Sequence, residues 1–302
     1  MTAADLFGTN LVAMVTPMNP DGSISLPGLT SLVDHLLTTG ADGLVVAGTT
    51  GEAPTLTDAE TTQLIQAVAT QANGRAKVIA GIGTYDTATT THRAHAAEAA
   101  GADGLLLVTP YYSKPTQAGL LAHCRAVADA TTLPVMLYDV PHRTGLALSP
   151  TTIAELATHP HIHAIKDAKG DLPEAMTLMA TTSLAYYCGI DDLNLPYLAA
   201  GATGLVSVTA NLTAGPNAAL LDAIRTSDLP TAQALHRSQI PTTTALTATS
   251  QGAPNTKAAL AELGVIPHAT VRLPLIEGQL SASELRTLAA TANALFAAGT
   301  PQ

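Results

Sequence analysis

One lysine stands where an apolar segment ends, in a chain with few charges. Residues 161–171 read HIHAIKDAKGD, which places Lys166 after the apolar run and before a glycine turn. A buried ammonium group is costly unless it is paired or used. An enclosed amine gains nucleophilic character, and it can attack a carbonyl group to form a Schiff base. The alternatives are a lysine that reaches solvent and pairs with Asp167, and Lys169 as the nucleophile.

Hydroxyl and guanidinium groups follow other apolar segments and could complete such a site. Residues 138–145 read YDVPHRTG. Tyr138 could carry protons, and the planar guanidinium of Arg143 could hold a carboxylate through both oxygens. Tyr112 is a second candidate proton carrier, since aromatic residues make up only 3% of the chain. The alternatives are core packing for the tyrosines and a surface loop for the arginine.

The segment GTTGE, residues 48–52, offers two hydroxyls beside a glycine. Thr49 and Thr50 could bind a carboxylate together with the backbone of Gly51. They could equally do no more than cap the turn that follows. The functional interpretation requires this segment to lie next to Lys166 in the fold.

Two other patterns suggest different sites. His159, His161 and His163 are spaced by two, so they could share a strand face and bind zinc, as in a class II aldolase. They stand at the start of their strand with no carboxylate among them, which weighs against a metal site. GIG at 81–83 resembles the opening of a dinucleotide-binding fingerprint, but its third glycine is missing.

Three segments echo one another along the chain, and each could form a buried strand. They read GADGLVVAG (40–48), GADGLLLVT (101–109) and GATGLVSVT (201–209). Each continues as an apolar run, which is typical of parallel strands covered on both faces. Similar runs lie at 11–15, 77–81, 134–140, 162–167 and 185–189. Helical patterns lie at 27–39, 57–73, 87–100, 116–131, 150–159, 171–181, 191–200 and 213–226.

This alternation of eight strands and eight helices predicts an α/β fold, a (β/α)8 TIM barrel over residues 1–227. In such a barrel the reactive side chains gather where the strands end, which would bring Lys166, Tyr138 and Thr49 together. From residue 228 the strand pattern stops. Helices near 229–249, 254–263 and 282–298 predict a C-terminal helical extension over 228–302.

The composition narrows the classes of partner. The 302 residues carry a net charge of −10 without any basic run, so no nucleic-acid partner is expected. Cys124 and Cys188 form no disulfide framework, a pattern typical of a reducing cytoplasm. Neither a signal peptide nor an apolar run long enough to span a membrane is recognisable. We therefore expect a cytoplasmic protein without a membrane partner.

Five motifs, in order and with matching spacing, resemble the dihydrodipicolinate synthase family of the N-acetylneuraminate lyase superfamily. They are GTTGE (48–52), VTPYYSKP (108–115), YDVPHRTG (138–145), IKDAKGD (165–171) and GATGLVSVTANL (201–212). The resemblance implies a class I aldolase-type lyase that condenses pyruvate with L-aspartate 4-semialdehyde in lysine and diaminopimelate biosynthesis, with no metal or organic cofactor. The alternatives are a sibling lyase for a sugar acid or another 2-oxo acid, and a binding or regulatory protein that kept the barrel.

The resemblance also implies catalytic roles. Lys166 would form the imine with pyruvate, and Tyr138 would relay protons. Thr49 would link Tyr138 to Tyr112, which would reach in from a neighbouring subunit. The implied assembly is a homotetramer of two tight dimers.

Four further positions would bind the substrates. Thr50 would hold the pyruvate carboxylate, and Arg143 would bind the carboxylate of the semialdehyde. Gly189 and Val206 would line the pocket through backbone contacts. Sialate lyases and ketodeoxy-sugar aldolases lack an arginine at the position of Arg143, so this residue favours the synthase branch.

Some positions depart from the family pattern. His142 replaces a small residue and could narrow the mouth of the site, and residues 189–192 read GIDD where GDD is commoner. The positions that match the lysine-binding cleft of inhibited relatives lack groups suited to the ends of lysine, which predicts weak or absent feedback by lysine. They are Pro54, Asp58, Thr61, Tyr85 and Thr89.

Overall fold

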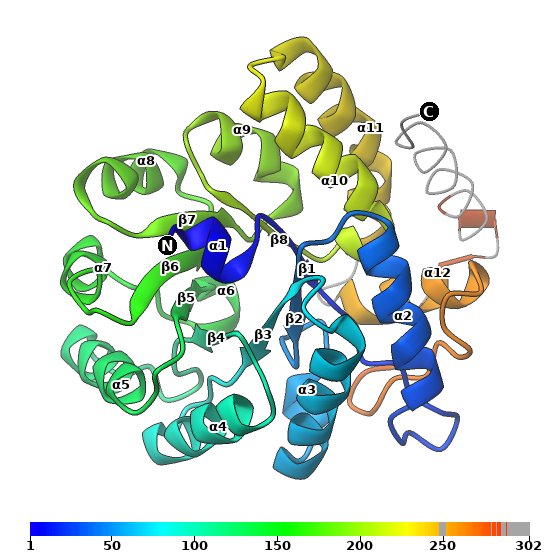
Figure 1. The fold of residues 1–302 in the computed structure, drawn as a ribbon, viewed down its shortest axis with the longest axis horizontal. Coiled ribbons are helices and arrows are strands. Elements are labelled where there is room, and N and C mark those ends of the chain that lie inside the picture. Colours follow the sequence, from blue (N-terminus) through cyan, green and yellow to red (C-terminus); the bar gives the residue numbers. More distant parts are fainter. Residues whose placement is uncertain (248–251, 279, 282, 285–287, 289–302) are drawn as a thin grey trace.

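A closed parallel barrel forms the centre of the molecule (Figure 1). The computed structural model describes residues 1–247, 252–278, 280, 281, 283, 284 and 288. Within these residues eight strands each pair with the next, and β8 pairs with β1. Their bounds are β1 Asn10–Ala13, β2 Gly43–Val46, β3 Lys77–Gly81, β4 Gly104–Val108, β5 Val135–Asp139, β6 Ile162–Asp167, β7 Ala185–Cys188 and β8 Gly204–Ser207. The predicted TIM barrel is confirmed.

The strands are buried on both faces, which explains their continuous apolar runs. On β6, Ala164 belongs to the cluster inside the barrel, whereas Ile165 belongs to the cluster between the strands and the surrounding helices. Side chains alternate along a strand with a period of two. The same alternation therefore directs Lys166 into the barrel.

Helices surround the strands and begin where the sequence offers capping groups. The side chain of Thr57 accepts a hydrogen bond from the N–H of Glu60 at 3.2 Å, which completes a capping box at the start of α3. None of the described helices has the length and apolar character needed to cross a bilayer. The bounds are α2 Leu26–Thr38, α3 Asp58–Ala72, α4 Thr87–Ala99, α5 Gln117–Asp129, α6 Pro141–Thr144, α7 Pro150–Leu156, α8 Leu172–Thr181, α9 Asn194–Ala199 and α10 Ala210–Arg225.

A short helix that the sequence analysis missed closes the N-terminal end of the barrel. This helix, α1 (Ala3–Phe7), lies over the centre of the barrel in Figure 1. Phe7 is fully buried inside the barrel, edge-on to the ring of Tyr187. The Tyr187 hydroxyl donates a hydrogen bond to the carbonyl of Gly8 at 2.8 Å. Phe7 and Tyr187 thus fill the N-terminal end of the barrel. A functional site can therefore lie only at the C-terminal ends of the strands.

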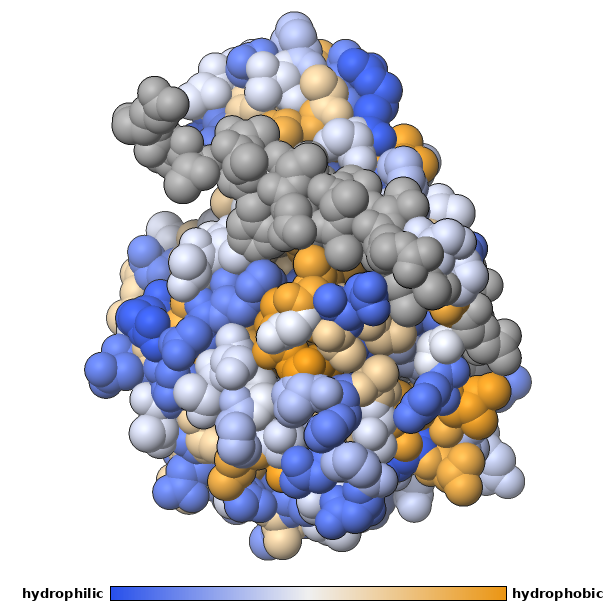
Figure 2. All heavy atoms as spheres, turned by 90° about the vertical axis from the view of Figure 1, so that its right-hand side faces the viewer, coloured by the Kyte–Doolittle hydropathy of each residue, from blue (hydrophilic) through white to orange (hydrophobic). Residues whose placement is uncertain are grey.

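The C-terminal helices continue from the barrel. α11 (Leu229–Thr247) packs on α10, and α12 (Gly252–Glu262) contacts both. Seen from the side of α2 and α12, the pair α10 and α11 forms a lobe at one end of the molecule (Figure 2). Helices near 229–249 and 254–263 were predicted and are present, whereas the helix predicted over 282–298 lies largely outside the described residues. The division of the chain at 227/228 remains a prediction.

Candidate active site

Lys166 lies inside the C-terminal end of the barrel. Its exposed fraction is 5%. β6 pairs with β5 so that Lys166 stands beside Tyr138, and the lysine Nζ lies 4.2 Å from the centroid of the tyrosine ring. The electron-rich face of a tyrosine ring attracts a cation at this distance. The amine is therefore enclosed next to a phenol, as a Schiff-base site requires.

The two alternatives for Lys166 do not fit this geometry. Asp167 is on the opposite face of β6, where it accepts a hydrogen bond from the Tyr197 hydroxyl at 3.0 Å. Lys169 forms an ion pair with Glu174 on α8. Lys166 is thus neither exposed to solvent nor displaced by Lys169 at the barrel mouth.

A cavity of about 350 Å³ opens above Lys166. It joins most of the residues that the sequence analysis singled out: Thr49, Thr50, Tyr138, Arg143, Lys166 and Gly189. A Cβ atom on Gly189 would lie 3.0 Å from Cε of Lys166, so glycine leaves room for the lysine chain. These groups come from four different strand ends, as expected for a barrel site.

The turn after β2 presents the two threonines to this cavity. The N–H of Glu52 donates to the carbonyl of Thr49 at 3.1 Å, and the hydroxyl of Thr16 donates to the carbonyl of Gly51 at 2.7 Å. Glu52 itself adopts a left-handed conformation with φ of 60°. A non-glycine residue in this region is strained, so its surroundings must hold it there.

Arg143 is on a helix instead of the predicted loop. The short helix α6 starts at Pro141 and ends at Thr144, and Gly145 caps it with a φ of 77° that suits glycine. It brings His142 and Arg143 to the wall of the cavity. Burial lowers the pKa of His142, and the neighbouring Arg143 charge acts in the same direction. The guanidinium of Arg143 is therefore the group on this wall that suits an anion.

Two predicted site residues lie elsewhere in this single chain. Tyr112 is 92% exposed, with a left-handed φ of 69°. Val206 is fully buried inside the barrel, and Val208, two residues further along, lines the cavity in its place. The period of two along a strand relates these two valines, and it was the available signal for finding Val208.

Sequence reasoning also missed Asp191 as a wall residue of the cavity. Its carboxylate accepts hydrogen bonds from the N–H groups of Val208 at 3.1 Å and Thr209 at 3.2 Å. One helix was predicted over 191–200, but a 3-10 turn spans Asp191–Leu193 and α9 starts at Asn194. Asp191 therefore ties the loop after β7 to the loop after β8.

A second cavity, of about 550 Å³, lies beside the first. Thr49, Tyr138 and Arg143 line both. The hydroxyl of Tyr111 in the second cavity lies 3.4 Å from that of Thr84. Two of the positions matched to a lysine-binding cleft, Pro54 and Tyr85, line this second cavity, as do other residues of the 47–56 segment.

The histidine and glycine patterns have structural explanations. His159 pairs with Asp129 at 3.0 Å, and Nδ1 of His161 lies 3.0 Å from the carbonyl of Ala128. Among the described residues no group of three or more His, Cys, Asp or Glu side chains could hold a metal ion. At Gly81 an added Cβ would lie 2.4 Å from the carbonyl oxygen of Ala47, so close packing of the backbone accounts for this glycine.

Comparison with known proteins places the chain in a family. The model of the Dihydrodipicolinate synthetase family matches residues 6–295. The 4-hydroxy-tetrahydrodipicolinate synthase of Acidothermus cellulolyticus is 51% identical over 271 residues, which are 90% of this chain and 87% of the relative.

Solved structures agree with that placement. Dihydrodipicolinate synthase DapA-2 of Bacillus anthracis superimposes with a TM-score of 0.89 at 36% identity, covering 98% of this chain and 99% of the other. The chloride-inhibited dihydrodipicolinate synthase of Acinetobacter baumannii, solved with pyruvate, gives a TM-score of 0.89 at 38% identity, covering 94% and 98%. With an enclosed lysine at the mouth of a barrel and these similarities across its length, the chain belongs to the Dihydrodipicolinate synthetase family.

Proposed function

We propose that this protein condenses pyruvate with L-aspartate 4-semialdehyde through a Schiff base on Lys166. The observation that carries the proposal is the enclosure of one amine, next to the phenol of Tyr138, in a cavity that also holds Thr49, Thr50 and Arg143. The protein is a lyase of lysine and diaminopimelate biosynthesis. The names of its relatives favour the 4-hydroxy-tetrahydrodipicolinate synthase reaction over the sugar-acid alternative.

The reaction starts when the amine of Lys166 attacks the keto carbon of pyruvate. Loss of water leaves an imine, which is a good electron sink. Removal of a methyl proton gives an enamine, whose carbon attacks the aldehyde of the second substrate. The amine of the semialdehyde then displaces Lys166, which closes the ring and frees the enzyme.

The other residues bind and move protons in these steps. Tyr138, with its ring against the lysine, relays protons during imine formation and the aldol step, with Thr49 as its hydroxyl partner. Thr50 and its backbone hold the pyruvate carboxylate. Arg143 binds the carboxylate of the semialdehyde at the shared wall of the two cavities, where a charged hydrogen bond is stronger than in water. Gly189 lines the cavity, and so does Val208, which takes the place expected of Val206. These steps need no metal or organic cofactor.

Tyr112 completes the site from a second subunit. Its exposure on the surface of one chain, held in a strained backbone conformation, suits a residue that acts across an interface. The assembly proposed is a homotetramer made of two tight dimers. We place the enzyme in the cytoplasm, without nucleic-acid or membrane partners.

Trapping with borohydride tests the proposal. Pyruvate and borohydride together should add the mass of a reduced pyruvate adduct to the peptide that contains Lys166. A binding protein without turnover would give no adduct. Assays with L-aspartate 4-semialdehyde and with N-acetylneuraminate as alternative second substrates then separate the synthase from a sugar-acid lyase.

A further inference from the structure

A buried ion pair connects the C-terminal helices to the catalytic turn. Lys257 of α12 contacts the carboxylate of Glu52, and both side chains are 0% exposed. The same lysine donates to the carbonyl of Thr270 at 2.7 Å, and the other oxygen of Glu52 accepts the N–H of Arg272 at 3.0 Å. Burial lowers the pKa of Lys257, while the charge of Glu52 opposes that effect. Two segments distant in sequence thus meet at Glu52.

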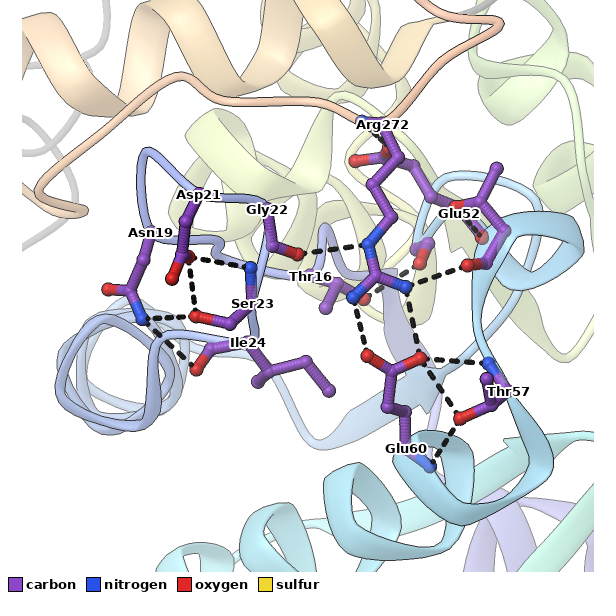
Figure 3. Close-up of polar contacts among 12 residues, drawn as sticks. Thr16, Asn19, Asp21, Gly22, Ser23, Ile24, Glu52, Thr57, Glu60 and Arg272 are labelled. Atoms are coloured by element: carbon purple, nitrogen blue, oxygen red, sulfur yellow. Dashed lines mark hydrogen bonds and ion pairs between the residues drawn. The ribbon is translucent and has the colours of Figure 1, made fainter.

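Arg272 extends this connection to Gly22 and Glu60 (Figure 3). Its guanidinium donates to the carbonyls of Gly22 at 2.9 Å and Thr55 at 2.7 Å. It also forms a bidentate ion pair with the carboxylate of Glu60. That carboxylate accepts a hydrogen bond from the N–H of Thr57 at 2.9 Å as part of the capping box of α3. One side chain therefore joins the loop after β1, the turn after β2 and the start of α3.

Stability alone does not account for a charge pair in this position. Replacing a buried ion pair with apolar groups of similar volume is often neutral or stabilising. This pair instead holds Glu52, whose left-handed backbone closes the turn by donating to the carbonyl of Thr49. The start of α12 also lines the cavity, through Gly252 and Ala253. The C-terminal helices thus touch the site both directly and through Glu52.

We propose that Lys257 and Arg272 are positioning residues that fix, through Glu52, the 49–52 turn in the conformation that binds the carboxylate of the keto acid. This inference rests on the proposed function, in which Thr50 and its backbone hold that carboxylate. It makes the C-terminal helices part of the pyruvate site, although neither Lys257 nor Arg272 is assigned a contact with substrate.

The test compares the native enzyme with the double variant Glu52→Gln/Lys257→Met, which leaves no unpaired buried charge. The pyruvate concentration that gives half-maximal borohydride trapping on Lys166 should rise about tenfold, the effect expected when one charged hydrogen bond is weakened. The KM for L-aspartate 4-semialdehyde should change less than about twofold, because Arg143 is outside the turn. Thermal unfolding of the variant checks that the fold is retained.

A second variant covers the case in which the double variant does not fold. Arg272→Lys keeps the positive charge but loses the planar fork, so it should raise the half-saturating pyruvate concentration about threefold. Arg225→Met is the matched control, since it breaks only the exposed ion pair with Asp222 on α10 and should leave trapping unchanged.

The outcomes distinguish a failure of the positioning role from a failure of the proposed function. Native half-saturation by pyruvate in a folded double variant would overturn the positioning role, as would native half-saturation in Arg272→Lys if the double variant does not fold. Absence of any pyruvate adduct in the native enzyme would instead overturn the proposed function.

Discussion

The chemistry of this protein depends on which face of one strand a lysine occupies. Lys166 and Asp167 are neighbours on β6, yet one faces the cavity and the other faces Tyr197. A register shift of a single residue would exchange them, because side chains alternate along a strand. An acid would then stand where the reaction needs an amine. The pairing of β6 with β5 and β7 sets this register and therefore the proposed nucleophile.

Substitution of Arg143 should weaken the binding of one substrate and leave that of the other unchanged. Arg143→Ala should raise the KM for L-aspartate 4-semialdehyde on the order of ten- to a hundredfold, because a hydrogen bond to a charged group contributes about 1.5–3 kcal/mol. Steady-state kinetics with each substrate varied in turn would measure this. Pyruvate trapping on Lys166 should keep its native concentration dependence.

Arg125→Ala provides the control for that change. Arg125 lies 3.7 Å from Glu155 in an ion pair whose side chains are about half exposed, so its loss should leave both KM values unchanged. A loss of pyruvate affinity in Arg143→Ala, with the semialdehyde KM unaffected, would contradict the assignment of Arg143 to the second substrate.

At the level of elements, β5 and β6 carry two acids on their outer faces. Asp139 and Asp167 are paired across these strands. Burial raises the pKa of Asp139 to about 7, helped by the charges of Asp167 and Glu174 and opposed by a hydrogen bond from the N–H of Leu148 and by Lys169. Burial raises the pKa of Asp167 as well. The folded protein therefore holds protons that the unfolded chain releases.

This arrangement predicts how stability depends on pH. Between about pH 4 and 7 the unfolded chain loses the proton of Asp139 while the folded protein keeps it, so the free energy of unfolding should fall as the pH rises. The Asp139→Asn substitution should make this decline shallower. At pH 8 the free energy of unfolding of the variant should exceed that of the native protein by up to a few kcal/mol. Urea denaturation at pH 5 and pH 8 measures both effects.

A residual decline is expected in the Asp139→Asn variant, because Asp167 titrates in the same direction. The exposed Asp222→Asn change, at an ion pair on the surface of α10, is a suitable control. An identical pH dependence in the native protein and in Asp139→Asn would rule out Asp139 as its source.

At the level of the whole molecule, the proposed action of Tyr112 across an interface predicts complementation. Lys166→Ala and Tyr112→Phe subunits should each have little activity alone. In a mixed dimer, one site combines Lys166 of the Tyr112→Phe subunit with Tyr112 of the Lys166→Ala subunit, so activity should return when both are co-expressed. Activity of purified hybrids, sorted by different affinity tags, measures this.

Two homogeneous preparations mixed without subunit exchange serve as the control for complementation. If hybrids stay as inactive as their parents, Tyr112 acts within its own subunit or not at all. Catalysis would then not require the proposed assembly.

The second cavity determines the expected response to lysine. Two of its charged wall residues are paired, Glu52 with Lys257 and Arg93 with Asp58 at 2.8 Å, and the third, Arg143, is shared with the first cavity. The two ends of a free lysine would therefore find few unused charges there. Activity should persist at about millimolar lysine, and initial rates over a lysine series would measure it. Inhibition at submillimolar lysine would refute this expectation.

The sequence by itself determined the barrel and most of the groups around its mouth. The strands predicted at 77–81 and 162–167 have the observed bounds. A buried strand appears in the sequence as one continuous apolar run, so its ends can be read from neighbouring residues alone. Thr49, Tyr138 and Lys166 could be grouped because the strand ends of a barrel share one face. The helix α6 was missed because its four residues give too short a pattern.

Only the tertiary structure decided how the site is held. Glu52 and Lys257 are 205 residues apart, and nothing in the spacing of either motif specifies their contact. The same holds for Arg272 and Glu60, and for Asp191 and the loop after β8. A periodic pattern records which face of an element is buried, but it does not record which charged partner a distant segment brings to that face. Packing of α12 and the segment after it against the turn after β2 selects Lys257 and Arg272 as partners, and packing of the loops after β7 and β8 selects the partner of Asp191.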